Sequence, residues 1–182
     1  MKTFNKLISE KLIINKNTKN IYEYAPKSKK ELQNIIDKIV KESKDGNINL
    51  NNIDINNPNI DSLENLFAFD TKIHTLDVSA WDVSNIKNLD YTFYELENLE
   101  YINLTGWDVK NVITMAGIFS SNFKLTTIKG IENWDVSNII ELEFVFEFCK
   151  NLKIDLSNWN INPNADTYHI VYKAPGVKLK MI

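Results

Sequence analysis

The chain has 182 residues, of which 43% are hydrophobic, and its formal net charge is −3 at pH 7. This apolar content is enough to bury a core, so we expect one compact unit. Residues 1–50 hold eleven lysines against six acids, net +5, and residues 51–182 hold ten against eighteen, net −8. The acidic body argues against direct nucleic-acid binding and suits a basic partner surface, unless it is only solvated surface charge.

The sequence contains no arginine and a single cysteine, Cys149. No intrachain disulfide can therefore form, and a reducing compartment is expected. No apolar run reaches the length of a signal peptide or of a membrane span. The sequence predicts a soluble, cytoplasmic protein that makes no contact with a membrane.

Residues 1–47 are predicted to form an N-terminal cap of strands and a helix that seals the first repeat. Residues 1–24 suggest a short hairpin with a polar turn. Ser28 and Glu31 form a capping box at the start of a helix. The apolar stripe of this helix consists of Leu32, Ile35, Ile36, Ile39 and Val40. Because the segment carries the positive charge, a separate partner-binding or dimerising element is the alternative.

A repeat dominates residues 48–162. The motif Trp-Asp-Val recurs with spacings of 26 and 27 residues, and a weaker copy follows after 25. These spacings fall within the range of leucine-rich repeats. A degenerate earlier copy lies at 53–55. The four tryptophans that begin the copies are Trp81, Trp107, Trp134 and Trp159.

Each copy predicts the same order of elements. Alternating stretches such as 76–79 and 102–105 predict strands with one buried face. After the Trp-Asp-Val turn, apolar residues at i, i+3 and i+7 predict a short helix: Ile86, Leu89 and Phe93; Val112, Met115 and Phe119; Ile139, Leu142 and Phe146. One copy cannot bury its own apolar face, so neighbours must stack. The predicted fold class is α/β, a leucine-rich-repeat solenoid of short parallel strands and short helices.

The repeated aromatic and acidic residues have structural interpretations. Stacked columns of tryptophan and phenylalanine are expected to dominate the core, since each ring buries about 150–250 Å². The aspartates Asp82, Asp108 and Asp135 occur in identical turns. We expect them to accept hydrogen bonds from local backbone N–H groups rather than to act in catalysis.

Residues 163–182 are predicted to form a C-terminal cap. Pro163 and Pro175 interrupt the repeat pattern. Alternating apolar residues then predict a last short strand that closes the solenoid or covers its edge: Val177, Leu179 and Met181.

No arrangement of residues predicts catalysis, a cofactor or a metal. His74 and His169 are far apart and occur in no ligand pattern, so each is expected at a surface or an edge. Cys149 falls at a core position and is predicted to be a buried thiol. Acid pairs such as Glu95 and Glu97 are expected on short helices, solvated. There is no glycine-rich phosphate loop. We expect a protein that is not an enzyme.

The motif Trp-Asp-Val-Ser-Asn-Ile, followed by Leu and Phe, resembles the BspA-type leucine-rich-repeat family. That family is also described as a mycoplasma-lipoprotein-associated repeat of about 25 residues. The resemblance covers roughly residues 50–160 in three near-complete copies. It implies an interaction module with no catalytic residues. Family members are often surface or secreted proteins, whereas others occur in phages and mobile elements. The chain departs from surface members because it shows no signal peptide or lipidated cysteine.

Surface recognition is the remaining function. The outward residues of the strands are expected to form a polar ladder, a common recognition surface in solenoids. Phe144 and Phe148 flank the core residue Phe146 and are candidate hot spots, unless they pack on the C-terminal cap. The predicted partner-binding residues are Asp77, Tyr101, Asn103, Lys129, Phe144, Phe148 and Asp155.

Three functions follow from these observations. The first is an intracellular phage or mobile-element protein that binds and blocks a host protein, such as a basic nucleic-acid-binding defence nuclease. The second is a surface or secreted adhesion module of a low-GC bacterium. The third is an enzyme, which would need a deep pocket with convergent ionisable groups. A homo-oligomer stays open, since a second copy could cover an edge strand.

Overall fold

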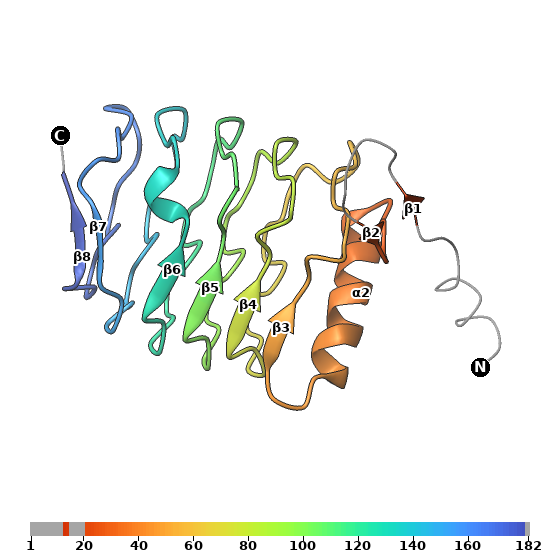
Figure 1. Cartoon of the computed structure of the whole chain (residues 1–182). Coiled ribbons are helices and arrows are strands. Elements are labelled where there is room, and N and C mark those ends of the chain that lie inside the picture. The colour runs from red at the N-terminus through yellow and green to blue at the C-terminus, as the bar shows by residue number, and fades with distance from the viewer. Residues whose placement is uncertain (1–12, 15–20, 181–182) are drawn as a thin grey trace.

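Four short strands lie side by side in parallel along one face of the molecule (Figure 1). The middle residue of each strand is buried and the residues on either side of it are not, as the alternating pattern predicts. The strands are β3 (Asn47–Asn49), β4 (Thr75–Asp77), β5 (Tyr101–Asn103) and β6 (Thr127–Lys129). We call the outer surface of these strands the strand face.

Two further strands, β7 (Ile154–Leu156) and β8 (Val177–Leu179), form a separate parallel pair. The computed structural model describes residues 13–14 and 21–180. In this part of the chain the protein is a parallel β-solenoid of about five turns with one α-helix. The prediction of a repeat solenoid with parallel strands is therefore confirmed.

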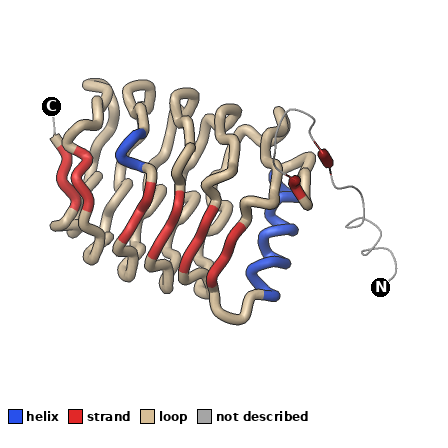
Figure 2. The backbone as a smooth tube through the Cα atoms, in the orientation of Figure 1, coloured by secondary structure: helices blue, strands red, loops and turns tan. Residues whose placement is uncertain are grey.

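The α-helix, α2 (Lys29–Glu42), lies beside β3 at one end of the solenoid (Figure 2). It begins as the capping residues predict, because Ser28 Oγ accepts a hydrogen bond from Glu31 N at 3.2 Å. Glu31 Oε2 also accepts one from Lys27 N at 2.8 Å. One side of α2 joins the same hydrophobic cluster as the strand residues. Its buried residues are Leu32, Ile36 and Val40.

The predicted N-terminal strands are present as β1 (Ile13–Ile14) and β2 (Ile21–Tyr22), which pair antiparallel. The polar turn predicted between them lies outside the described residues. Tyr24 then forms a parallel bridge with Ile53, which connects this region to the first turn of the solenoid.

The prediction of a short helix in every repeat is wrong. Beyond α2, the only helical segment among the described residues is the 3-10 helix η1 (Ile131–Asn133), as Figure 2 shows. Tyr91 and Glu95 have φ values of 53° and 52°, which a right-handed helix excludes. Between them, Phe93 N donates to Ile118 O on the next turn at 3.0 Å instead of to its own segment. Bonds between turns thus replace the helical bonds that so short a segment would form weakly.

Two sets of aromatic rings run through the core, as predicted. Consecutive rings of the phenylalanine column are 5.4, 5.6 and 5.8 Å apart between centroids and nearly parallel. The column consists of Phe67, Phe93, Phe119 and Phe146. The last three tryptophans stack at 6.1 and 6.4 Å. No ring of either set is more than 5% exposed, so each contributes most of its area to the core.

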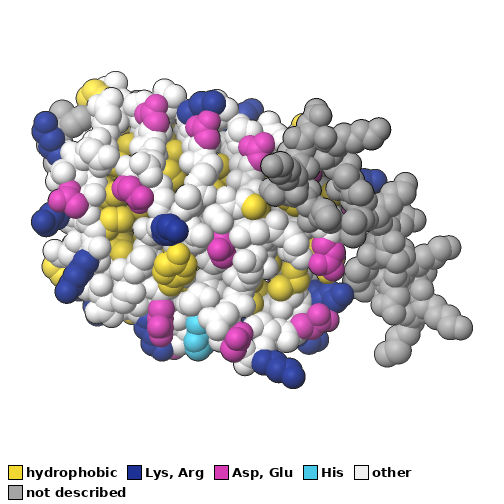
Figure 3. All heavy atoms as spheres, viewed as in Figure 1, with side chains coloured by type: hydrophobic (Ala, Val, Ile, Leu, Met, Phe, Trp, Pro, Cys, Tyr) yellow, Lys and Arg dark blue, Asp and Glu magenta, His cyan; other side chains and the backbone are white. Residues whose placement is uncertain are grey.

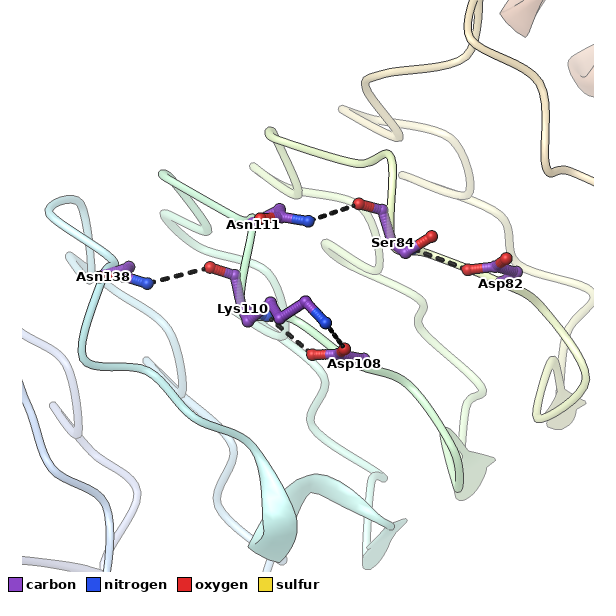
Figure 4. A network of polar contacts seen from close by, with 6 residues as sticks. All are labelled: Asp82, Ser84, Asp108, Lys110, Asn111 and Asn138. Carbon is purple, nitrogen blue, oxygen red and sulfur yellow. Dashed lines mark hydrogen bonds and ion pairs between the residues drawn. The ribbon is translucent and has the colours of Figure 1, made fainter.

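The aspartates of the Trp-Asp-Val turns bind backbone, as predicted (Figure 4). Asp82 Oδ1 accepts a hydrogen bond from Ser84 N at 3.0 Å, and Asp108 Oδ1 accepts one from Lys110 N at 3.2 Å. Asparagines connect successive turns in the same place: Asn111 Nδ2 donates to Ser84 O at 2.9 Å. The repeated Asp and Asn therefore fix the turn and its stacking.

Residues 163–180 form another turn. Phe144 N and Phe146 N donate to Tyr168 O and Ile170 O, each at 2.9 Å. The predicted last strand is β8, paired with β7, and Met181 lies outside the described residues.

Candidate functional site

The strand face brings together four of the predicted partner-binding residues. Asp77, Asn103 and Lys129 occupy one row across β4, β5 and β6, because they are direct partners in the parallel register. Tyr101 lies in the neighbouring row, between Thr75 and Thr127. In Figure 3, which shows the molecule from the side seen in Figure 1, hydrophobic side chains form only small separated patches. The strand face is therefore predominantly polar.

Asp155 lies apart from this group. It belongs to β7, in the separate sheet, and its exposed carboxylate is 3.8 Å from Lys178 Nζ of β8. The structure thus places five of the predicted residues on strands but only four of them in one sheet.

The side chain of Asp77 is engaged within the protein. Its carboxylate accepts hydrogen bonds from Asn51 Nδ2 at 2.9 Å, Asn103 Nδ2 at 3.2 Å and Ser79 Oγ at 2.7 Å. Burial raises the pKa of this carboxyl, but these donors together lower it below its ordinary value. Asp77 therefore orders the neighbouring turns and has few lone pairs left for a partner.

A second face is formed by equivalent segments of five turns. Backbone N–H groups of each segment donate to carbonyls of the next, for example Tyr91 N to Ala116 O at 2.8 Å and Gly117 N to Glu143 O at 2.8 Å. We call this surface the ladder face. In each segment two residues four positions apart have positive φ, and, apart from Gly117, these residues are not buried. The segments are 64–69, 90–95, 116–121, 143–148 and 168–173.

The ladder face holds the other two predicted residues, Phe144 and Phe148. Both are half-buried and pack edge-on against tyrosines of the last turn, with centroids 5.6 Å from Tyr168 and 5.7 Å from Tyr172. The sequence left open whether these two rings are exposed hot spots or pack against the C-terminal residues, and the structure shows that they pack there. The two rings thereby become part of a larger aromatic surface.

That larger surface was not predicted. His169 lies stacked between Tyr168 and Tyr172, with centroids 4.0 and 4.4 Å away, and its Nδ1 is 3.3 Å from Glu147 Oε1. Tyr168 is 58% exposed and Tyr172 is 41% exposed. The last turn begins with the weaker copy of the motif at Trp159, which was the available signal. Tyr168 and Tyr172 follow Trp159 by 9 and 13 residues, whereas Phe144 and Phe148 follow Trp134 by 10 and 14, so the tyrosines fall one position away from the equivalent residues.

A hollow of about 400 Å³ opens at the edge of the ladder face. Its apolar walls are Phe69, 63% exposed, and Phe123, 41% exposed. Glu95 and Glu97 line it as well, together with Thr71. The prediction that these two acids lie on a short helix is wrong, since both lie in turns and Glu95 is half-buried.

Further acids gather around Glu143, in a ladder segment that does not line the hollow. Glu143 has a raised pKa because burial disfavours its charge, and because Asp166, Glu141 and Asp90 lie near it. Among the described residues, Glu143 forms no ion pair. The ladder face therefore combines exposed aromatic rings with negative charge.

The remaining candidate groups show no chemistry of this kind. His74 is exposed, as predicted. Cys149 is buried, as predicted; its Sγ donates to Phe119 O, and burial raises the pKa of the thiol to about 12. The described residues contain no group of three His, Cys, Asp or Glu side chains placed to hold a metal ion. Within the same residues, no helix has the length and apolar character needed to cross a bilayer.

The profile of one protein family matches residues 61–181, well over half of the chain. That family is described as "Mycoplasma protein of unknown function, DUF285". Comparison with curated proteins and with solved structures gives no match to this chain.

Proposed function

Because this chain belongs to the mycoplasma protein family DUF285 and is a repeat solenoid, we propose that it is a non-enzymatic scaffold that binds a partner protein. Solenoids present long surfaces on which equivalent positions of successive turns lie side by side. This geometry favours recognition of an extended protein surface over enclosure of a small substrate.

The main support for a partner-binding function is that exposed aromatic rings are concentrated on the ladder face and at its edge. Six large hydrophobic side chains are more than 40% exposed among the described residues, and four of them lie there. Aromatic residues are enriched at binding hot spots, where a ring buries a large area with little loss of conformational freedom. The four residues are Phe69, Phe123, Tyr168 and Tyr172.

The charge supports a basic partner surface. Residues 51–182 carry ten lysines against eighteen acids, and acids line the ladder face among the aromatic rings. Complementary charge speeds association and selects among partners more than it adds affinity.

We further propose that the chain is a BspA-like leucine-rich-repeat protein in which residues 1–47 form an N-terminal cap. One buried strand position per turn and the apolar side of α2 support this description. The partner would be a host protein, such as a defence nuclease, blocked in the cytoplasm by a phage or mobile-element protein. A surface adhesion module is the alternative, and cell fractionation distinguishes the two because only the second is exported.

The test is affinity capture from a lysate of the source organism, with nuclease added. We expect one partner at near-equal stoichiometry. The double variant Tyr168→Ser/Tyr172→Ser should lose it, because it removes two exposed rings of the ladder face. The matched strand-face variant Tyr101→Ser should retain it. Capture that depends on Tyr101 alone would move the site to the strand face, and absence of any partner would contradict the scaffold.

A further inference from the structure

The hollow at the edge of the ladder face has the composition of a cation site. Phe69 and Phe123 form its apolar walls, and Glu95 and Glu97 lie between them. A cation is attracted electrostatically to the face of an aromatic ring and to a carboxylate. An anionic ligand would meet two carboxylates there, and a purely apolar ligand would bury them without a partner.

Lysine ammonium groups of the chain itself already lie over aromatic rings of this surface. Lys150 Nζ lies 5.3 Å from the centroid of Phe123, and Lys173 Nζ lies 5.1 Å from the centroids of both Phe148 and Tyr172. These separations are within the range of cation–π attraction. Rings of this surface are therefore oriented so that a lysine ammonium group can lie over them.

In the part of the chain that the structure describes, the carboxylates of the hollow are not neutralised by a cation. Within residues 13–14 and 21–180, neither Glu95 nor Glu97 takes part in an ion pair. Glu95 is half-buried and shares the hollow with the carboxylate of Glu97. A positive group entering the hollow would be attracted to both carboxylates, so charge complementarity identifies the occupant as a cation.

We propose that the hollow formed by Phe69, Glu95, Glu97 and Phe123 binds a lysine or arginine side chain of a basic segment of a partner protein. The aliphatic stem packs between the two rings, and the charged end reaches the carboxylates. This inference rests on the proposed scaffold function and names the part of the partner that the ladder face recognises.

The probe is a short fluorescent peptide of alternating lysine and glycine, titrated with the full chain at low ionic strength and followed by anisotropy. An arginine version should also bind. A twin peptide with acetylated lysines keeps the length but loses the charge, and it should not bind measurably. Equal binding of the acetylated twin, or no binding of either basic peptide, would overturn the inference.

Variants separate the hollow from general attraction to an acidic protein. Phe69→Ala/Phe123→Ala keeps the charge and should weaken binding about tenfold, and Glu97→Gln about threefold. The controls lie outside the hollow and the ladder face: Tyr101→Ala removes a ring from the strand face, and Glu42→Gln removes one exposed charge from α2. Each control should change affinity less than twofold or so. Equal weakening by Glu42→Gln and Glu97→Gln would show non-specific attraction and contradict a defined site.

The outcome is separable from that of the scaffold proposal. If Phe69→Ala/Phe123→Ala captures the lysate partner as the unaltered chain does, the hollow is not the recognition site and the scaffold function stands. If the unaltered chain captures no partner, the scaffold function fails, whatever the peptide shows. Circular dichroism and the unfolding temperature confirm that each variant is folded.

Discussion

At the scale of single residues, the four repeat tryptophans differ in one respect. The indole Nε1–H of Trp107 donates to Val78 O at 2.9 Å, and Trp81 and Trp159 make equivalent bonds to the preceding turn. Trp134 Nε1 is buried and has no hydrogen-bond partner in the described structure. The interval from Trp107 to Trp134 is the longest between these tryptophans, at 27 residues, and its extra residue lies near η1, where Gly130 closely approaches the backbone of Thr105.

This difference predicts the outcome of Trp→Phe substitutions. Trp107→Phe and Trp134→Phe remove the same atoms from similar core positions, but only the first removes a hydrogen bond. We expect Trp134→Phe to cost about 1 kcal/mol less in the free energy of unfolding. Urea denaturation of both variants measures it. Equal losses would mean that the indole bond adds nothing to stability.

Asp77 predicts a pH dependence. The pKa of its carboxyl is lowered in the folded protein, so the folded state prefers the charged form more than the unfolded state does. Its contribution to stability is therefore complete above the ordinary value of 3.8 and is lost as the pH falls through the lower folded pKa. The difference in unfolding free energy between the unaltered chain and Asp77→Asn should shrink below that pH. A difference that stays constant down to full protonation would contradict the assignment.

At the scale of elements, the ladder face depends on backbone conformations that L-residues seldom adopt. Each ladder segment has two positions with positive φ, four residues apart. At Gly117, with φ of 58°, a Cβ would also collide with the ring of Tyr91. Glycine at this position lets the Tyr91 ring lie over the backbone of the next turn.

Gly117→Ala should therefore destabilise the protein by roughly 1–2 kcal/mol, from the positive φ and from displacement of Tyr91. Ser121→Gly is the matched control, because Ser121 has φ of 63° and glycine relieves rather than creates strain there. Thermal unfolding compares the two. A neutral Gly117→Ala would show that the ladder segment is free to rearrange.

Much of the element structure could be predicted, and the errors have physical causes. The alternation around Leu76 and Ile102 identified strands, since only one face of a sheet is buried there. The spacing of Ile86, Leu89 and Phe93 is typical of a helix, but tight turns can also bury these three positions. Tyr91 has a positive φ, although tyrosine in the sequence gives no sign of that conformation. The hydrogen bonds to the next turn cannot be predicted from the sequence of a single repeat.

The candidate site could be predicted less well, for a related reason. Phe144 and Phe148 stood out because they flank a core ring. Their partners Tyr168 and Tyr172 are more than twenty residues further along the chain, in a turn that has only the weaker copy of the motif. The hollow joins residues of three different turns, with Glu95 between Phe69 and Phe123. Such a site exists only after the repeats are aligned in space.

At the scale of the whole molecule, stability should be distributed along the solenoid. Each turn contacts its neighbours, so the cost of removing a core ring depends on how many neighbours it has. Phe119 stacks on Phe93 and Phe146, whereas Phe67, nearer to the end, has one phenylalanine neighbour.

Phe119→Ala should thus cost about 3–5 kcal/mol, near the upper end for a buried ring, and Phe67→Ala less. Native-state hydrogen exchange should rise on both sides of Phe119, in the amides of 91–95 and 144–148. Protection lost equally at all positions in both variants would indicate a single cooperative unit without nearest-neighbour behaviour.

The register between successive turns has a consequence for how such a protein changes size. Because equivalent residues align directly from strand to strand, duplicating or deleting one whole repeat leaves the cross-section unaltered. The outward positions then keep a constant pitch, close to the strand separation of about 4.8 Å. Only the length of the solenoid would change. Related chains with different numbers of repeats would therefore match partner surfaces of different length that share the same spacing.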